Sequence, residues 1–138
     1  MYTPPVKTNL TMLTDFYEIT MANGYFQNGY RDRIVYFDMF FRNIPDNGGF
    51  AIMAGVQEVA EYMKNLTFTE KDIDYLKSCK IFSEEFLQYL KDFHFCCDVW
   101  AVPEGVPIFP GEPILTVRGP VIQAQFVETM ILLTINHE

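Results

Sequence analysis

The chain has 138 residues, 49% of them hydrophobic and 16% aromatic, which is enough apolar material for the core of one domain and argues against disorder. Its formal net charge is -8, from 18 acidic residues and 10 scattered basic residues. A nucleic-acid-binding surface needs clustered Lys and Arg to neutralise phosphates, so this composition argues against nucleic acid as a partner.

The cysteines and the first residues predict a cytoplasmic protein. Three cysteines cannot all pair, and Met1–Pro5 lacks the basic and apolar runs of a secretory signal, so a reducing compartment fits best. His94, Cys96 and Cys97 are residue types that bind metals. However, adjacent cysteines on a strand point to opposite faces, and the two-residue spacer of zinc sites is missing. We therefore expect no metal site.

The segment Leu13–Phe26 is the most distinctive part of the chain and predicts a helix that begins near residue 15. Thr14 or Asp15 can cap this helix, and Glu18 completes an approximate capping box with Asp15. Helical spacing directs Tyr17 away from the core. Tyr17 could form an aromatic wall for a planar ligand, with the Asp15 carboxylate beside it. The simpler alternatives are a packed tyrosine and a helix cap.

The next predicted element is a strand over Ile34–Phe41, whose β-branched and aromatic residues indicate a buried position. Asp38 and Arg42 lie on one face, about 13 Å apart at about 3.3 Å per residue, so they do not form a direct ion pair. Arg42 precedes the glycine-containing loop Pro45–Gly49, where its guanidinium could bind a phosphate. Solvent is the simpler partner for this arginine.

A short strand over Gly49–Ala54 and a helix from Gly55 to Asn65 are expected next. Two segments then share the pattern F-[TS]-E-x-x-[IL]-x-Y-L-K, namely Phe68–Lys77 and Phe82–Lys91. Each has a Ser or Thr cap after an aromatic residue, so the sequence predicts two short helices in series. Two copies are too few for a repeat array, and neither glycine-rich nucleotide-binding motif, G-x-G-x-x-G or G-x-x-x-x-G-K-[ST], is present.

From Phe95 onward the hydrophobic residues alternate, and Pro and Gly divide the chain into short segments. This pattern predicts a β meander or a small barrel. Asp98, Glu104 and Glu112 fall at strand edges and turns, so we expect them to be solvated and not to form a catalytic acid pair.

Residues 121–138 predict a final helix that is apolar on nearly all sides. Such a helix belongs in the centre of a larger structure and lacks a stop signal at His137–Glu138, so we expect the chain to be the first portion of a longer protein. The run Phe126–Ile135 is too short to span a bilayer and contains Glu128, which argues against a membrane helix. His137 is expected to be structural.

Several segments, in this order along the chain, resemble nicotinate phosphoribosyltransferase. They are Leu13–Tyr17, Thr20–Ala22, Gly24–Phe26, Phe37–Asn43, Gly48–Ile52, Val102–Gly105, Phe109–Leu115, Gly119–Pro120 and Glu128–His137. An ordered set over the full length is more specific than any single motif.

The resemblance implies the α+β N-terminal portion of a type II phosphoribosyltransferase, with residues 1–120 as an α+β domain and 121–138 as the start of a helix that leads into an irregular α/β barrel. It implies an enzyme of NAD salvage that makes nicotinate mononucleotide and pyrophosphate from nicotinate and phosphoribosyl pyrophosphate, with coupled ATP hydrolysis and Mg²⁺. It also implies a homodimer with shared active sites.

The resemblance further implies roles for three residues. Tyr17 would stack on the nicotinate ring across the dimer, Asp15 would lie beside it, and Arg42 would reach a phosphate, also across the dimer. No catalytic residue is expected before the end of this chain, so the chain alone should be inactive. A nicotinamide-using relative and a non-enzymatic α+β binding or oligomerisation module are the alternatives.

Overall fold

A computed structural model describes residues 8–137; Glu138 and residues 1–7, which include the segment Met1–Pro5, lie outside the described part. The helices and strands are α1 (Phe16–Gln27), β1 (Ile34–Met39), the 3-10 helix η1 (Pro45–Asn47), β2 (Ala51–Ile52), α2 (Val56–Asn65), α3 (Glu70–Ser78), α4 (Glu84–Lys91), β3 (Asp98–Ala101), β4 (Pro107–Ile108), β5 (Leu115–Pro120), α5 (Val121–Phe126) and α6 (Glu128–His137). No helix among the described residues is long and apolar enough to cross a membrane.

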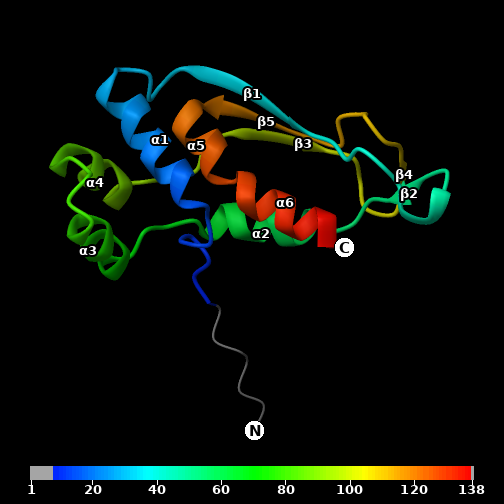
Figure 1. Cartoon of the computed structure of the whole chain (residues 1–138), viewed down its shortest axis with the longest axis horizontal. Coiled ribbons are helices and arrows are strands. Elements are labelled where there is room, and N and C mark those ends of the chain that lie inside the picture. Colours follow the sequence, from blue (N-terminus) through cyan, green and yellow to red (C-terminus); the bar gives the residue numbers. More distant parts are fainter. Residues whose placement is uncertain (1–7, 138) are drawn as a thin grey trace, which may run out of the picture.

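The strands form two small antiparallel sheets, which makes the fold α+β as predicted. Strand β5 lies between β1 and β3, with Val117 opposite both Phe37 and Val99. Strands β2 and β4 form a separate two-stranded sheet (Figure 1). The predicted meander or barrel is therefore wrong, because β1 and β2, which precede α3 and α4, pair with strands that follow them. Period-two alternation identifies strands but not their partners.

The predicted buried strand β1 is in fact a largely exposed edge strand. It pairs with β5 on one side only, and just Met39 is buried, whereas Tyr36 is 64% exposed. Figure 1 shows the helices gathered on one side of the three-stranded sheet, where α5 contacts β1 and β5. An apolar composition on both faces of a strand therefore did not predict burial, because only one face is covered.

The two similar helices occur as predicted, and their caps are the reason. Thr69 forms a capping box with Asp72 at the start of α3. Ser83 accepts a hydrogen bond from the Phe86 backbone at the start of α4. In Figure 1 these two helices lie at the end of the sheet opposite the β2–β4 pair. Side-chain caps act within three residues, so they can be recognised from sequence.

The expected single helix over residues 121–138 is instead two helices that are divided at Val127. Helix α5 is buried against α1 and the sheet. Helix α6 buries only Ile131 and leaves Leu132 39% and Leu133 53% exposed. No Gly or Pro marks this break in the sequence. The break lies between α5, which packs on the sheet, and the first two residues of α6, Glu128 and Thr129, which bind α1. The division expected at residue 120 stays a prediction.

Candidate functional site

Asp15 lies at the N-cap of α1, but its side chain does not cap the helix. Its backbone is extended, with φ -67° and ψ 138°, and no side-chain capping hydrogen bond is formed. Its backbone N–H donates to Thr129 Oγ1 of α6 at 3.2 Å. The expected helix start is confirmed, whereas the expected capping box with Glu18 is wrong because that carboxylate is turned into the interior.

Glu18 is fully buried and was missed as a candidate site residue. Hydroxyl groups of Thr14 and Thr129 donate to its two carboxylate oxygens, the latter at 2.5 Å. Burial raises the pKa of Glu18, the hydroxyl hydrogen bonds oppose this shift, and the charge of Glu128 adds to it. Ala22 lies one turn after Glu18 on the same face of the helix and is also buried. This small apolar residue is the sequence signal that Glu18 faces the interior.

Tyr17 lies on the first turn of α1 with 46% of its surface exposed. Its hydroxyl donates to Glu128 Oε1 of α6 at 3.0 Å. Burial, followed by the hydrogen bond to Glu128, raises the Tyr17 pKa to about 12, so the phenol stays protonated and remains a donor near neutral pH. Among the described residues no aromatic ring packs against Tyr17, which leaves the ring available to a planar ligand.

Arg42 is exposed in the segment between β1 and η1, which leads toward the two-stranded sheet. The described residues show no ion pair of Arg42, and no hydrogen bond joins it to Tyr17 or Asp15. Asp38 instead accepts a hydrogen bond from Thr116 Oγ1 at 2.6 Å. Within this chain both Tyr17 and Asp15 are therefore hydrogen-bonded to α6, whereas Arg42 has no hydrogen bond to either of them.

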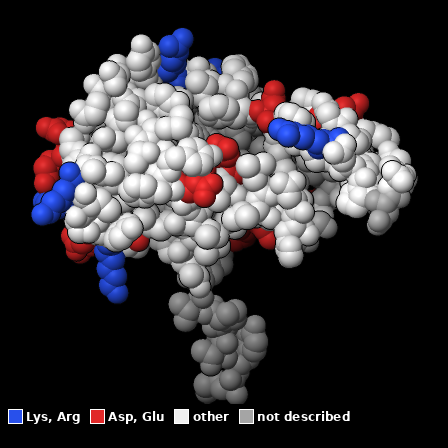
Figure 2. All heavy atoms as spheres, in the orientation of Figure 1, with Lys and Arg blue, Asp and Glu red and all other residues white. Residues whose placement is uncertain are grey.

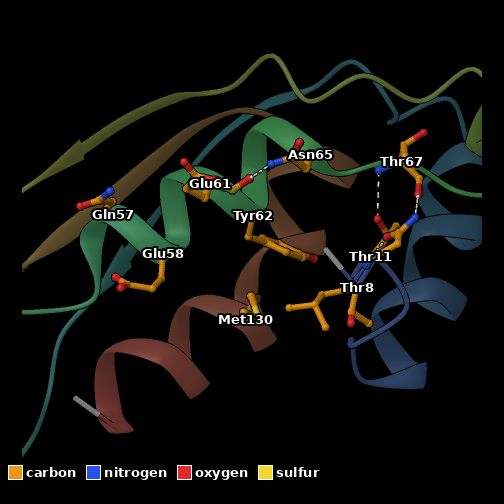
Figure 3. Close-up of a pocket in the computed structure, with 11 residues that line it drawn as sticks. Thr8, Thr11, Gln57, Glu58, Glu61, Tyr62, Asn65, Thr67 and Met130 are labelled. Carbon is orange, nitrogen blue, oxygen red and sulfur yellow. Dashed lines mark hydrogen bonds between the residues drawn. The ribbon is translucent and has the colours of Figure 1, made fainter. Parts of the chain in front are cut away.

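A cavity of about 510 Å³ lies between α2, the segment before α1 and Met130 of α6 (Figure 3). Its described lining is Thr8, Asn9, Leu10, Thr11, Gln57, Glu58, Glu61, Tyr62, Asn65, Thr67 and Met130. Hydrogen bonds from Thr67 to Thr11 and from Asn9 to Thr67 hold the N-terminal segment against α2. Tyr62 is buried and its hydroxyl has no hydrogen-bond partner among the described residues. None of the predicted site residues lines this cavity.

A smaller cavity of about 290 Å³ lies between the sheet and α6. Most of its lining is apolar, and Glu128 and Asp38 are its acidic residues; the full lining is Phe37, Asp38, Met39, Leu115, Val117, Ala124, Glu128, Ile131 and Leu132. Glu128 therefore contacts both this cavity and the Tyr17 hydroxyl. Tyr17 itself does not line this cavity.

Two of the other polar candidates, Asp98 and Glu104, make structural contacts. Asp98 pairs with Arg118 at 3.0 Å, and Glu104 accepts a hydrogen bond from the Gln57 backbone at 3.0 Å. The side chains that the structure describes include no group of three His, Cys, Asp or Glu that could hold a metal ion. Burial raises the pKa of Cys97 to about 12, so its thiol is a poor nucleophile near neutral pH. His137 is exposed at the end of α6.

Comparison with known proteins identifies the family. The family profile of the nicotinate phosphoribosyltransferase (NAPRTase) N-terminal domain matches residues 12–136. Nicotinate phosphoribosyltransferase pncB2 of Mycobacterium tuberculosis is 41% identical over 121 residues, covering 88% of this chain and 26% of that protein. The nicotinate phosphoribosyltransferase of Bacillus subtilis is 35% identical over 130 residues, covering 94% of this chain and 26% of that protein.

The fold is also similar to a solved enzyme structure. The crystal structure of human nicotinic acid phosphoribosyltransferase superposes with a TM-score of 0.82 at 33% identity, covering 88% of this chain and 25% of that chain. The expected fold class, the α+β N-terminal portion of a type II phosphoribosyltransferase, is confirmed by this likeness. The chain spans about a quarter of the length of these relatives. The chain thus belongs to the nicotinate phosphoribosyltransferase family and matches its N-terminal domain.

Proposed function

We propose that this chain is the N-terminal domain of a cytoplasmic enzyme that joins nicotinate to phosphoribosyl pyrophosphate and releases nicotinate mononucleotide and pyrophosphate. The family match over residues 12–136 carries this proposal, because the curated relatives are named for that activity. The working enzyme would be a homodimer with shared active sites and would include an α/β barrel. ATP hydrolysis would be coupled to the reaction.

Tyr17 would provide the face on which the nicotinate ring stacks, and Asp15 would lie beside that ring. The exposed Tyr17 ring and its fixed hydroxyl support this role, since stacking needs an open aromatic face in a defined orientation. Attack of the pyridine nitrogen on the ribose anomeric carbon would displace pyrophosphate. Positioning and electrostatics at the reacting atoms would supply most of the rate enhancement, and Tyr17 of this domain would contribute by binding nicotinate before that step.

Arg42 would bind a phosphate group of the second substrate. An exposed guanidinium without an ion-pair partner among the described residues can offer two parallel N–H donors to a phosphate. Mg²⁺ would accompany ATP, but the described residues hold no cluster suited to it, and no metal-binding role is assigned to them.

The test is product formation by the purified full-length protein. Nicotinate and phosphoribosyl pyrophosphate should give nicotinate mononucleotide, and ATP with Mg²⁺ should increase its yield. Nicotinamide in place of nicotinate serves as the matched substrate control. A preference for nicotinamide would replace the proposed substrate, whereas no product from either pyridine would favour a non-enzymatic module.

A further inference from the structure

Two consecutive residues at the start of α1 bind two consecutive residues at the start of α6. The Tyr17 hydroxyl donates to Glu128 Oε1 at 3.0 Å, and the Thr129 hydroxyl donates to Glu18 Oε1 at 2.5 Å. Thr129 Oγ1 also accepts a hydrogen bond from the Asp15 backbone at 3.2 Å. Both side-chain pairs are 111 residues apart in the sequence. These contacts, which we name the α1–α6 junction, therefore join distant parts of the chain.

Glu18 anchors the α1–α6 junction in the interior. It is fully buried, and each of its carboxylate oxygens is bound by a threonine hydroxyl, from Thr14 or Thr129. A rotation of α1 would take this buried carboxylate away from Thr129, and losing a hydrogen-bond partner in the interior is costly. Successive residues on an α-helix point about 100° apart, so fixing Glu18 also sets the direction in which Tyr17 leaves the helix.

Tyr17 forms the open end of the α1–α6 junction. Nearly half of its surface is exposed, so packing alone leaves more than one side-chain rotamer accessible. The hydrogen bond to Glu128 holds the hydroxyl and restricts those rotamers. Glu128 belongs to α6 and is not carried by the same helix as Tyr17, so the ring is held from two elements.

We propose that Glu128 and Thr129 are positioning residues that hold the Tyr17 ring in its ligand-stacking orientation. This inference rests on the proposed function, because it concerns the ring on which nicotinate would stack. A ring that is oriented before the substrate arrives loses less conformational entropy on binding. The α1–α6 junction therefore strengthens nicotinate binding and leaves the turnover of bound substrate unchanged.

Steady-state kinetics of the full-length enzyme test this role. Glu128→Ala and Tyr17→Phe should each raise the KM for nicotinate about three- to tenfold at unchanged kcat, because each removes one partly exposed hydrogen bond. The KM of the double variant for nicotinate should not exceed the higher KM of the two single variants, because both substitutions remove the same hydrogen bond. Glu128→Gln retains a carbonyl oxygen acceptor and should restore KM to within about twofold.

Glu70→Ala is the matched control for Glu128→Ala. Glu70 is the exposed first residue of α3, as Glu128 is of α6, so both substitutions remove a carboxylate from a helix N-terminus. The control variant should keep the wild-type KM. An unchanged KM in Glu128→Ala would overturn the positioning role. Failure of Glu128→Gln to restore KM would also overturn it, since charge and not hydrogen bonding would then be the important property.

A second measurement reports on the junction without any activity. In ¹³C-tyrosine-labelled full-length protein, the Tyr17 Cζ signal, identified by its loss in Tyr17→Phe, should shift in Glu128→Ala and stay near its wild-type position in Glu128→Gln. An unmoved signal in Glu128→Ala would refute the Tyr17–Glu128 contact. The two proposals can fail separately. If the Tyr17 signal shifts in Glu128→Ala but the wild-type protein makes no nicotinate mononucleotide, the proposed function is refuted and the α1–α6 junction is supported.

Discussion

At the residue scale, the carboxylate of Glu18 has the most demanding environment among the predicted or candidate site residues. It is fully buried, yet it binds only two neutral hydroxyl groups and has no cationic partner among the described residues. Burial raises its pKa, and the nearby Glu128 carboxylate adds to this shift. Folding therefore favours the protonated form of Glu18.

The raised pKa of Glu18 predicts a pH-dependent stability. Its stabilising contribution is fully present below 4.5, the ordinary pKa of a glutamate, and is lost as the pH rises through the higher pKa of the folded state. Glu18→Gln cannot ionise, so its thermal unfolding midpoint should rise relative to that of the wild type as the pH increases above 4.5. Glu58→Gln, an exposed first-turn glutamate of α2, is the control. A constant difference across this range would contradict the prediction.

Arg42 provides a separate prediction for the second substrate. Arg42→Ala in the full-length enzyme should raise the KM for phosphoribosyl pyrophosphate about 10- to 100-fold, because two charge-assisted hydrogen bonds to a phosphate are lost. The KM for nicotinate should change little. Arg31→Ala removes another exposed arginine, one that already pairs with Asp32 at 2.9 Å, and should leave both constants unchanged. A normal phosphoribosyl pyrophosphate KM in Arg42→Ala would refute the phosphate role.

At the element scale, strand β5 is the central strand of the three-stranded sheet. It pairs with β1 and β3, and it is followed directly by the buried helix α5. Gly119 near its end lies against Cys97, the residue before β3. A Cβ at position 119 would lie 2.3 Å from the Cys97 sulfur and 2.9 Å from its Cβ. The close approach of these two strands therefore depends on the missing side chain.

Gly119→Ala should accordingly destabilise the protein by about 1–3 kcal/mol, the usual cost of overpacking. Gly24→Ala is the opposite case: it lies inside α1 with no atom within 4 Å of an added Cβ. That substitution should stabilise the protein by about 0.5–1 kcal/mol, because alanine loses less entropy in a helix. Denaturant unfolding measures both values, and a Gly119→Ala variant as stable as Gly24→Ala would refute the close packing.

At the scale of the whole molecule, much of the surface around α1 and α6 is uncharged. Figure 2 shows a face that is mostly white, with a few Asp or Glu side chains near its centre and most Lys and Arg toward its edges. On these two helices the large exposed hydrophobic residues are Phe16, Tyr17, Met21, Leu132 and Leu133. Exposed apolar surface of this kind promotes association when nothing covers it.

The 138-residue chain made alone should therefore self-associate at concentrations of about tens of micromolar. Proteins with exposed apolar surface aggregate in this concentration range. Leu132→Ser combined with Leu133→Ser should shift the chain toward monomer in size-exclusion chromatography with light scattering. Ile131→Ser is the control: Ile131 is buried, so its replacement should unfold the chain instead of solubilising it. A wild-type chain that stays monomeric would contradict this prediction.

Local chemistry made several elements predictable from the sequence. The Thr69 and Ser83 caps each depend on residues within one turn of the chain, and helices also begin after Asp15 and Gly55 as the sequence predicts. Asp15 and Tyr17 could be recognised as candidates because they belong to such a local pattern, and their roles toward a ligand stay predictions. The burial of Glu18 could not be predicted from the sequence, because a glutamate in the first turn of a helix is usually interpreted as part of a capping box. Its burial depends on the contact with α6.

By itself, then, the sequence determined where most helices begin, that the remainder forms short strands, and which family the chain resembles. Only the tertiary structure decided which strands pair, that β1 lies at an edge, that the last helix breaks at Val127 and that Glu18 is buried. The physical reason is the sequence separation over which each kind of interaction acts. Caps and turns act over three or four residues, whereas pairing and burial depend on contacts such as Tyr17 with Glu128, 111 residues apart.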